Sequence, residues 1–172
     1  MNKSRTTLAL ALASAASLVA VGSPALAATS STTATTAPTQ CVLVLDEVKA
    51  GESASHVSLH KCFSGPGASA RAAAAVPRAA AQTELMIWAE DANYGGAYTR
   101  IYGNAGTCDG SGYSFNPNSW WSSHLSSFTL EGACNRSFVR GPRGNASFSG
   151  QLVGYVGDSL NDAVDYIKIW RG

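Results

Sequence analysis

The chain has 172 residues, a formal net charge of +1 and a hydrophobic fraction of 45%. A nearly neutral protein has no electrostatic attraction to nucleic acid or to an anionic membrane surface, so neither class of partner is expected. Its four cysteines include no Cys-x-x-Cys spacing, which argues against a zinc site or a thioredoxin-type site.

Residues 1–27 are typical of a cleavable signal peptide. A positively charged start precedes an apolar run at residues 8–21, which is shorter than the ~20 apolar residues that a membrane-spanning helix needs. Ala25 and Ala27 match the small-x-small pattern that signal peptidases read, so we expect cleavage after Ala27 and a secreted, extracellular protein. Residues 28–40, mainly Ala, Ser, Thr and Pro, are predicted to be a flexible leader.

Residues 41–63 have the pattern of one β-hairpin. An apolar run at residues 42–45 is followed by a turn signal, and residues 56–60 alternate on the return. Cys41 and Cys62 lie at the open end of this hairpin, so we expect a disulfide bond between them. Because a lone hairpin is only marginally stable in water, the unit either docks on the next domain or serves as a pro-segment.

Residues 64–83 are rich in Ala and are predicted to be a linker, with a helical turn near residues 72–75. The folded module is predicted to span residues 84–172. Short runs between Gly, Asn and Ser clusters predict an all-β sandwich or barrel, with strands at residues 85–88, 98–102, 126–130, 137–140, 151–155 and 166–170. Cys108 and Cys134 flank the middle of the module, and a disulfide between them would contribute roughly 3 kcal/mol of stability.

A degenerate pattern occurs twice in this module. Residues 90–96 (Glu-Asp-Ala-Asn-Tyr-Gly-Gly) are followed later by residues 121–128, and residues 145–150 are followed by residues 160–167. This layout resembles a single βγ-crystallin domain, in which two Greek-key motifs pack as a sandwich, and the resemblance covers about residues 85–172. A disulfide-closed hairpin before one such domain is similar to exported actinobacterial proteins. Those are grouped with the crystallin-like metalloproteinase inhibitors and killer-toxin-like proteins.

The resemblance implies a possible calcium cofactor. Calcium-binding members of the family carry the motif Asn/Asp, Asn/Asp, x, x, Ser/Thr, Ser in each half. Each site combines the acidic pair of one copy with the hydroxyl residue of the other. Residues 122–127 keep the hydroxyl half of the motif, and residues 161–166 keep the acidic pair. Calcium takes about 6–8 oxygen ligands, and backbone carbonyls and waters supply those that side chains do not.

The resemblance assigns the better calcium site to Asn161, Asp162 and Ser126, with Glu90 as an additional oxygen donor. The residues alone favour a simpler explanation, in which Asn161 and Asp162 form a turn stabilised by its own side-chain hydrogen bonds. With the resemblance, we expect one weak calcium site.

A second calcium site would depend on Ser123 and Asp165, and we expect it to be weaker than the first. Asp165 replaces the hydroxyl residue of the motif and is a stronger oxygen ligand than Ser. In the second half, Arg140 is taken as the equivalent of Glu90, and its positive charge is unfavourable for binding a cation.

A catalytic site is not expected, because the chain has three histidines and no nucleophile elbow or phosphate-binding loop. The principal alternative is a secreted proteinase inhibitor with an extracellular protease as its partner, and a small killer-toxin-like protein is a second alternative. The protein is expected to be a monomer. The candidate inhibitor loop consists of Arg140, Gly141, Pro142 and Arg143.

Overall fold

The computed structural model describes residues 39–78 and 82–172. The predicted signal peptide and nearly all of the predicted leader lie outside the described residues. No helix in the described part of the chain is long and apolar enough to cross a membrane.

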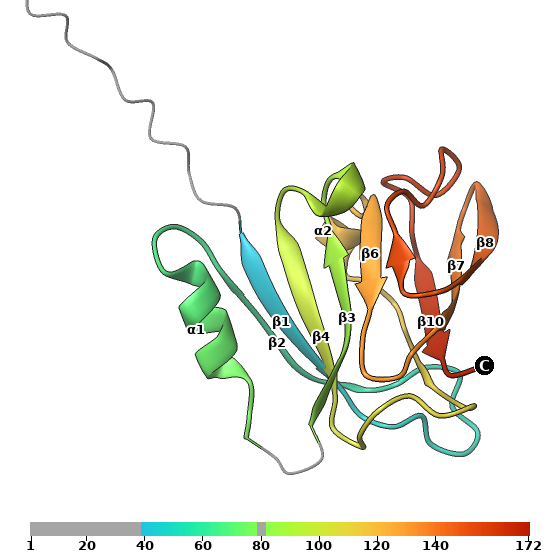
Figure 1. Ribbon diagram of the computed structural model, residues 1–172, viewed down its shortest axis with the longest axis horizontal. Helices are drawn as coiled ribbons and strands as arrows, with labels where there is room; N and C mark the ends of the chain where they lie inside the picture. Colours follow the sequence, from blue (N-terminus) through green and yellow to red (C-terminus); the bar gives the residue numbers. More distant parts are fainter. Residues whose placement is uncertain (1–38, 79–81) are drawn as a thin grey trace, which may run out of the picture. The chain divides into compact units, whose positions relative to one another are not determined.

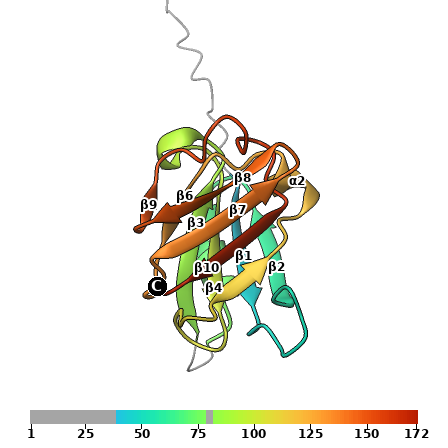
Figure 2. The same cartoon turned by 90° about the vertical axis from the view of Figure 1, so that its right-hand side faces the viewer.

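The described residues form two β-sheets, which confirms the prediction that the protein is built mainly of β-strands (Figure 1). The larger sheet has the order β2-β1-β4-β3-β6-β9 and the smaller has the order β5-β10-β7-β8. The strands of the larger sheet are β1 (Gln40–Leu45), β2 (Val57–Phe63), β3 (Thr83–Ala89), β4 (Tyr98–Gly103), β6 (Ser127–Leu130) and β9 (Leu152–Val153). Those of the smaller sheet, seen side by side in Figure 2, are β5 (Tyr113–Phe115), β7 (Arg136–Gly141), β8 (Gly144–Ser149) and β10 (Tyr166–Trp170).

One apolar core lies between the two sheets. Strands β4, β7 and β10 bury alternate residues, as in β10, where Ile167 and Ile169 are fully buried and their neighbours are not. Trp88 on β3 packs against Phe115 on β5, with 5.4 Å between the ring centroids, and so joins the two sheets. Trp121 also packs against Trp88, with 5.2 Å between their ring centroids.

Each half of residues 82–172 contributes a short strand to the sheet of the other half. The first half supplies β3, β4 and β6 to the larger sheet, and its β5 pairs with β10 in the smaller sheet. The second half supplies β7, β8 and β10 to the smaller sheet, and its β9 pairs with β6 in the larger sheet. This exchange brings the loops of the two halves together at one end of the molecule.

The predicted hairpin is present, and its disulfide joins Cys41 to Cys62 as expected. The hairpin is also part of the larger sheet, because β1 pairs with β4 in parallel. Its loop reaches the smaller sheet, where the N–H of Ser55 donates to the carbonyl of Ser114 at 2.6 Å. Of the two roles considered for the hairpin, the structure shows docking on the module.

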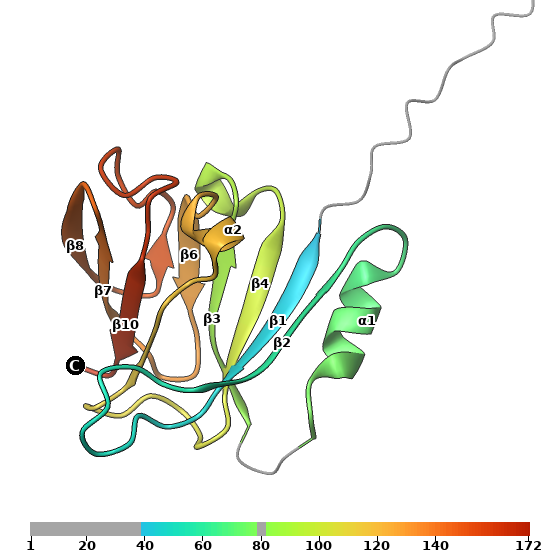
Figure 3. The same cartoon turned by 180° about the vertical axis from the view of Figure 1, so that it is seen from behind.

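A helix occupies much of the segment predicted to be a linker. Helix α1 (Ala68–Ala75) is longer than the expected turn, and it packs against β1 and β2 (Figure 3). Ala68 and Ala72 are one helical turn apart and are both buried, so the small alanine side chains allow the helix to approach the sheet closely. Alanine also has the highest helix propensity, which explains why this sequence forms a helix once it has a surface to pack on.

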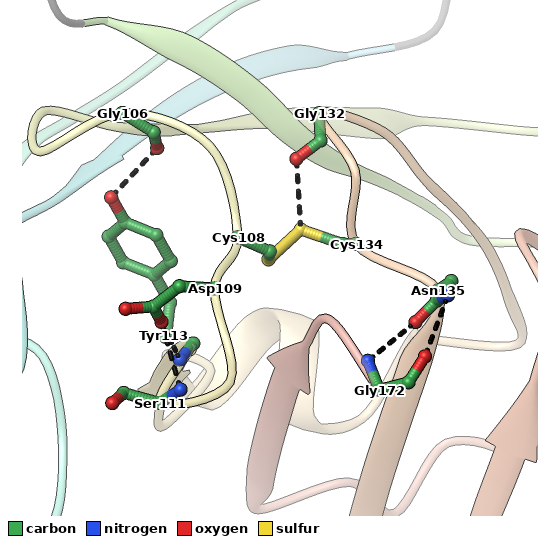
Figure 4. The surroundings of a disulfide bond; sticks show 10 residues. Gly106, Cys108, Asp109, Ser111, Tyr113, Gly132, Cys134, Asn135 and Gly172 are labelled. Carbon is green, nitrogen blue, oxygen red and sulfur yellow. Dashed lines mark hydrogen bonds between the residues drawn. A yellow bond between two sulfur atoms is a disulfide. The ribbon is translucent and has the colours of Figure 1, made fainter.

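The second predicted disulfide, Cys108–Cys134, is also present (Figure 4). It ties the long connection between β4 and β5 to the turn that follows β6. Asp109 shapes the same connection, because its Oδ1 atom accepts hydrogen bonds from the N–H groups of Ser111 and Gly112. Tyr113 closes it by donating to the carbonyl of Gly106 at 2.9 Å.

The predicted strands match the observed ones in most places. Strands β3, β4, β6, β7 and β10 lie where the short runs between turn-forming clusters indicated. Strand β9 is shorter than the predicted strand at residues 151–155, and two observed strands were not predicted. Strand β5 has only three residues, too few to show a period, and β8 was not among the predicted strands. Two short helical elements, η1 (Ala92–Tyr94) and α2 (Ser119–Ser122), occur in connections.

Candidate functional site

The two copies of the six-residue motif lie side by side. The N–H of Asp162 donates to the carbonyl of Leu125 at 3.2 Å, and the N–H of Val164 donates to the carbonyl of Ser122 at 3.0 Å. These residues are far apart in the sequence, and the exchanged strands β5 and β9 bring their loops together. The acidic pair of the second copy is therefore next to the hydroxyl residues of the first.

Ser126 is held rigidly by its backbone. Its N–H donates to the carbonyl of Ala89 at 3.1 Å, and its own carbonyl accepts from the N–H of Val156 at 3.0 Å. The residue is 6% exposed, and its hydroxyl has no hydrogen-bond partner among residues 39–78 and 82–172. Its oxygen is therefore free to bind a ligand in the first candidate site.

Asn161 and Asp162 form the exposed tip of the loop before β10. The Nδ2 atom of Asn161 donates to Oδ2 of Asp162 at 2.7 Å, and Asp162 adopts a left-handed backbone conformation with φ of 56°. This is the self-bonded turn that the residues alone predicted. It leaves the Oδ1 atom of Asp162 without a hydrogen bond within the described part of the chain.

Glu90 follows directly after the residue that anchors Ser126. Its Oε2 atom accepts from the N–H of Ala97 at 3.0 Å, which closes the hairpin between β3 and β4. The Oε1 atom has no hydrogen-bond partner in the described residues. Glu90 is thus tied to its own hairpin through one oxygen and can offer the other.

The oxygen atoms of the first candidate site suit a hard cation. The hydroxyl of Ser126, Oδ1 of Asp162 and Oε1 of Glu90 are all unused oxygens, the atom type that calcium prefers. One feature opposes binding: Arg143 donates through Nη2 to the carbonyl of Asn161 and through Nε to that of Ser159, which places a positive charge beside the loop. The oxygen types in this set are ones that calcium accepts, and a set with so little negative charge would bind it weakly.

The carboxylate of the second candidate site is already paired with a positive charge. Arg140 donates through Nε to Oδ1 of Asp165 at 3.1 Å, and its guanidinium lies over the ring of Tyr166. The hydroxyl of Ser123 donates to the carbonyls of Ser119 and Trp120 on α2. A cation would have to displace a guanidinium there, so these residues do not fit calcium as they stand.

The hydrogen bonds also correct an equivalence expected from the sequence. The N–H of Asp165 donates to the carbonyl of Arg140 at 2.8 Å, just as the N–H of Ser126 donates to that of Ala89. Arg140 is therefore equivalent to Ala89, and Gly141 takes the place of Glu90. The second half has no side chain at all at this position.

The candidate inhibitor loop is a tight turn. Gly141 pairs with Gly144, so that Pro142 and Arg143 form a two-residue connection between β7 and β8. The side chain of Arg143 is bound to the neighbouring loop rather than extended into solvent. A protease cleft normally receives an extended segment, and this connection does not provide one.

Two further side chains near the site were not anticipated. Tyr155 donates to Oδ1 of Asp158 at 2.8 Å, and this hydrogen bond raises the pKa of the Tyr155 hydroxyl. The carboxylate of Asp162 raises the same pKa further. The concentration of Asp and Asn at residues 158–165 was the available signal in the sequence.

The remaining cluster of metal-type ligands in the described residues consists of Cys41, His60 and Cys62. Because the two cysteines form a disulfide, this cluster is not a metal site. No family model matches the chain, no curated protein matches it and no solved structure matches it. Similarity to known proteins therefore identifies neither its family nor its function.

Proposed function

We propose that the protein is a secreted, non-catalytic protein of the βγ-crystallin type with one weak calcium site. The site consists of Asn161, Asp162 and Ser126, with Glu90 as a further oxygen donor. The observation that carries this proposal is the hydrogen bond from the N–H of Asp162 to the carbonyl of Leu125. It joins the acidic pair of one motif copy to the hydroxyl residues of the other.

The order of the strands supports the domain type. In a Greek key, the fourth strand returns to lie beside the first. Strand β6 lies beside β3 in the first half, and β10 lies beside β7 in the second. The third strand of each half, β5 or β9, joins the opposite sheet, so two interlocked four-strand motifs account for residues 82–172.

Secretion is part of the proposal. Two disulfides among the described residues indicate that the chain folds in an oxidising environment. The signal-peptide pattern at residues 1–27 supports export through a secretory pathway that cleaves a signal peptide. Sequencing the N-terminus of the protein from culture medium should give a chain that begins at Ala28, and an intact residue 1 in the medium would contradict this route.

The calcium site should be weak and should stabilise the fold. A ligand that binds only the folded state stabilises it by RT ln(1 + [L]/Kd). Extracellular calcium modules have Kd values on the order of 10⁻⁴ to 10⁻³ M. Calcium at roughly ten times Kd would then add about 1.4 kcal/mol, which should raise the melting temperature by several degrees.

The test is thermal unfolding of the full secreted chain with and without millimolar calcium, with magnesium as the ion control. Asp162→Asn should remove most of the calcium-dependent rise in melting temperature, because it removes a charged ligand. Ser126→Ala should reduce the rise as well, although it lies far away in the sequence. Ser123→Ala is the matched control and should leave the rise unchanged.

Two results would overturn the calcium proposal. A wild-type melting curve that does not respond to calcium would leave Asn161 and Asp162 as an ordinary turn. A calcium response that survives Asp162→Asn and Ser126→Ala would place the ion elsewhere in the molecule.

A further inference from the structure

The two disulfides of the described residues differ in how open they are to solvent. Cys108 and Cys134 are 1% and 0% exposed, so that bond lies inside the module. Cys41 is also 1% exposed, but its partner Cys62 is exposed on β2, which is an edge strand of the larger sheet. A thiol in solution can therefore approach the Cys41–Cys62 bond from the side of Cys62.

His60 lies next to the exposed cysteine. It comes two residues before Cys62 on β2, so both side chains project from the same face of the sheet. The Nε2 atom of His60 is 3.6 Å from Sγ of Cys62, which is hydrogen-bond distance for a sulfur atom. A ring nitrogen of His60 and the sulfurs of Cys41 and Cys62 all lie within 4.8 Å of one another. One imidazole is therefore close to both sulfurs of this bond.

Asn118 determines which nitrogen of His60 carries the proton. Its Oδ1 atom accepts from the N–H of Trp121 at 2.9 Å, so its amide nitrogen is left for His60. Nδ2 of Asn118 lies 3.5 Å from Nδ1 of His60 and can only donate, so Nδ1 is the acceptor. A neutral imidazole that accepts through Nδ1 carries its proton on Nε2. The Nε2–H group of His60 is therefore directed at Sγ of Cys62.

The surroundings favour the neutral form of the His60 ring. The cavity of about 190 Å³ beside it is lined by uncharged residues, namely Leu43, Val57, Trp88, residues 116–118 and Trp121. Partial burial lowers the pKa of the ring below its ordinary value of 6.5. The nearby cations do not face it: Lys61 alternates with His60 and so points to the opposite face, where Arg71 lies over the ring of Phe63. His60 is thus the side chain placed to stabilise a negative charge on Cys62.

We propose that Cys62 is a thiol–disulfide exchange centre, at which an external dithiol opens the Cys41–Cys62 bond and His60 donates through Nε2 to the released sulfur. Opening this bond removes the covalent hold on β2, whose one neighbouring strand is β1. Strand β1 keeps its place, because it is also paired with β4. The exchange centre shares no residue with the proposed calcium site.

The exchange proceeds in two steps, with the dithiol as the reductant. A thiolate of the dithiol attacks Sγ of Cys62, a bond forms between these two sulfurs, and the Cys41–Cys62 bond breaks with its electron pair on Cys41. The sulfur of Cys41 takes the proton that the second thiol of the dithiol loses. That second thiolate attacks the first sulfur of the dithiol and releases Cys62 as a thiolate. The dithiol leaves as a cyclic disulfide, oxidised by two electrons, and the two cysteines are reduced.

Reduction of the full secreted chain under native conditions tests this proposal. Mixtures of reduced and oxidised dithiothreitol, followed by alkylation of free thiols and peptide mass spectrometry, should open the Cys41–Cys62 bond while the Cys108–Cys134 bond stays closed. His60→Gln should raise the reduced-to-oxidised ratio needed for half-opening about tenfold, because the reduced form loses one hydrogen bond to a charged sulfur. His56→Gln is the matched control and should leave the ratio unchanged, since His56 bonds to Asp46.

A second measurement separates this hydrogen bond from a merely structural role of His60. In Cys41→Ala, Cys62 is a free thiol, and its alkylation rate follows the fraction of thiolate. Half of the maximal rate should be reached below pH about 8.5, the midpoint of an ordinary cysteine. Adding His60→Gln or Asn118→Ser should move this midpoint upward. Serine keeps an N-cap oxygen for α2 but lacks the amide that fixes the ring proton on Nε2.

Two results would overturn the exchange proposal. If the Cys41–Cys62 bond opens only under conditions that also open the Cys108–Cys134 bond, both are structural crosslinks. If His60→Gln leaves either the half-opening ratio or the alkylation profile of Cys62 unchanged, the histidine does not act on the sulfur.

Discussion

Ser126 and Asp165 occupy the same position in the two halves of residues 82–172. Each donates its backbone N–H to the carbonyl of a residue near the end of a strand, Ala89 in one half and Arg140 in the other. The hydroxyl of Ser126 is unused in the described structure, while the carboxylate of Asp165 is paired with Arg140. The same backbone arrangement therefore holds an unpaired hydroxyl in one half and a carboxylate paired with arginine in the other.

The connections in the two halves differ in a second way. In the first half, a long connection joins β4 to β5, and the Cys108–Cys134 disulfide anchors it. In the second half, β8 and β9 are separated by only Gly150 and Gln151. A long connection loses more conformational entropy on folding, so a covalent link is most useful in the first half.

The largest expected difference between the halves concerns Gly141 and its equivalent, Glu90. A Cβ atom at Gly141 would lie 1.7 Å from the carbonyl oxygen of Ala163, so the backbone would have to move. We expect Gly141→Ala to cost about 3 kcal/mol in the free energy of unfolding. Glu90→Ala should cost only about 1 kcal/mol, through the lost hydrogen bond to Ala97.

Chemical denaturation of both variants measures this difference. Equal losses for Gly141→Ala and Glu90→Ala would show that the two halves do not superimpose at this position. Gly144→Ala on the same turn is a useful companion, because the nearest atom to its Cβ, in the side chain of Ser159, would be 3.5 Å away. That variant tests backbone strain at the turn without the collision.

The sixth position of each motif copy, Ser127 or Tyr166, should give the next largest difference in the stability lost on substitution. The hydroxyl of Ser127 accepts from the N–H of Tyr94 at 2.9 Å and donates to the carbonyl of Asp91 at 2.6 Å. Because Ser127 is fully buried, Ser127→Ala should cost about 2 kcal/mol of stability. Tyr166→Phe, at the equivalent position, should have little effect, because the Tyr166 hydroxyl makes no hydrogen bond in the described residues.

Urea unfolding of Ser127→Ala and Tyr166→Phe provides the measurement. A loss in Tyr166→Phe as large as that in Ser127→Ala would mean that the second half depends on a tyrosine contact that the structure does not show. Hydrogen exchange at Tyr94 should increase in Ser127→Ala alone.

A smaller effect is expected when the ion pair of the second half is removed. The Arg140 and Asp165 side chains are 51% and 47% exposed, so Arg140→Gln should change stability by less than about 1 kcal/mol. It would also release the carboxylate of Asp165. If the ion pair is what closes the second site, calorimetric titration of Arg140→Gln should show a second calcium equivalent.

The double variant Arg140→Gln/Asp165→Asn is the control, and it should return to one calcium equivalent. A single equivalent in Arg140→Gln itself would show that removing the guanidinium does not open a second calcium site. The two halves would then differ in backbone geometry as well as in charge.

The smallest effect is a pH dependence confined to the first half. Hydrogen bonds from the N–H groups of Gly112 and Ser111 lower the pKa of Asp109 below its ordinary value. A carboxyl whose folded-state pKa is lowered stabilises the fold above its unfolded pKa of about 3.9, and this contribution is lost as the pH falls through the folded pKa. Asp109→Asn should therefore reduce the loss of melting temperature between neutral and acidic pH.

The comparison variant for this measurement is Asp158→Asn in the second half, since Asp158 is an exposed carboxylate that does not bond to the backbone of its loop. It should leave the acid-dependent loss unchanged. If both variants lose the same melting temperature on acidification, the ionised carboxylate of Asp109 does not stabilise the connection between β4 and β5.

Local patterns in the sequence were sufficient for several features of this protein. The alternation at β4 and β10 reflects strands that face the core on one side, and the apolar run at β1 reflects a strand that is buried on both faces, so these strands were predictable. The two disulfide pairings were also predictable, because Cys41 and Cys62 close one hairpin and Cys108 and Cys134 both belong to the module that follows it. The acidic pair Asn161 and Asp162 was visible as a motif.

Contacts between distant segments decided the rest. The parallel pairing of β1 with β4 and the ion pair between Arg140 and Asp165 depend on where strands exchange between sheets, which no local period contains. The cavity between the hairpin and Trp88 likewise exists only because four separate segments meet there. Residue types and spacing showed which side chains could bind a ligand. The tertiary structure determined which of those side chains are free, because hydrogen bonds and ion pairs from elsewhere in the chain already occupy the others.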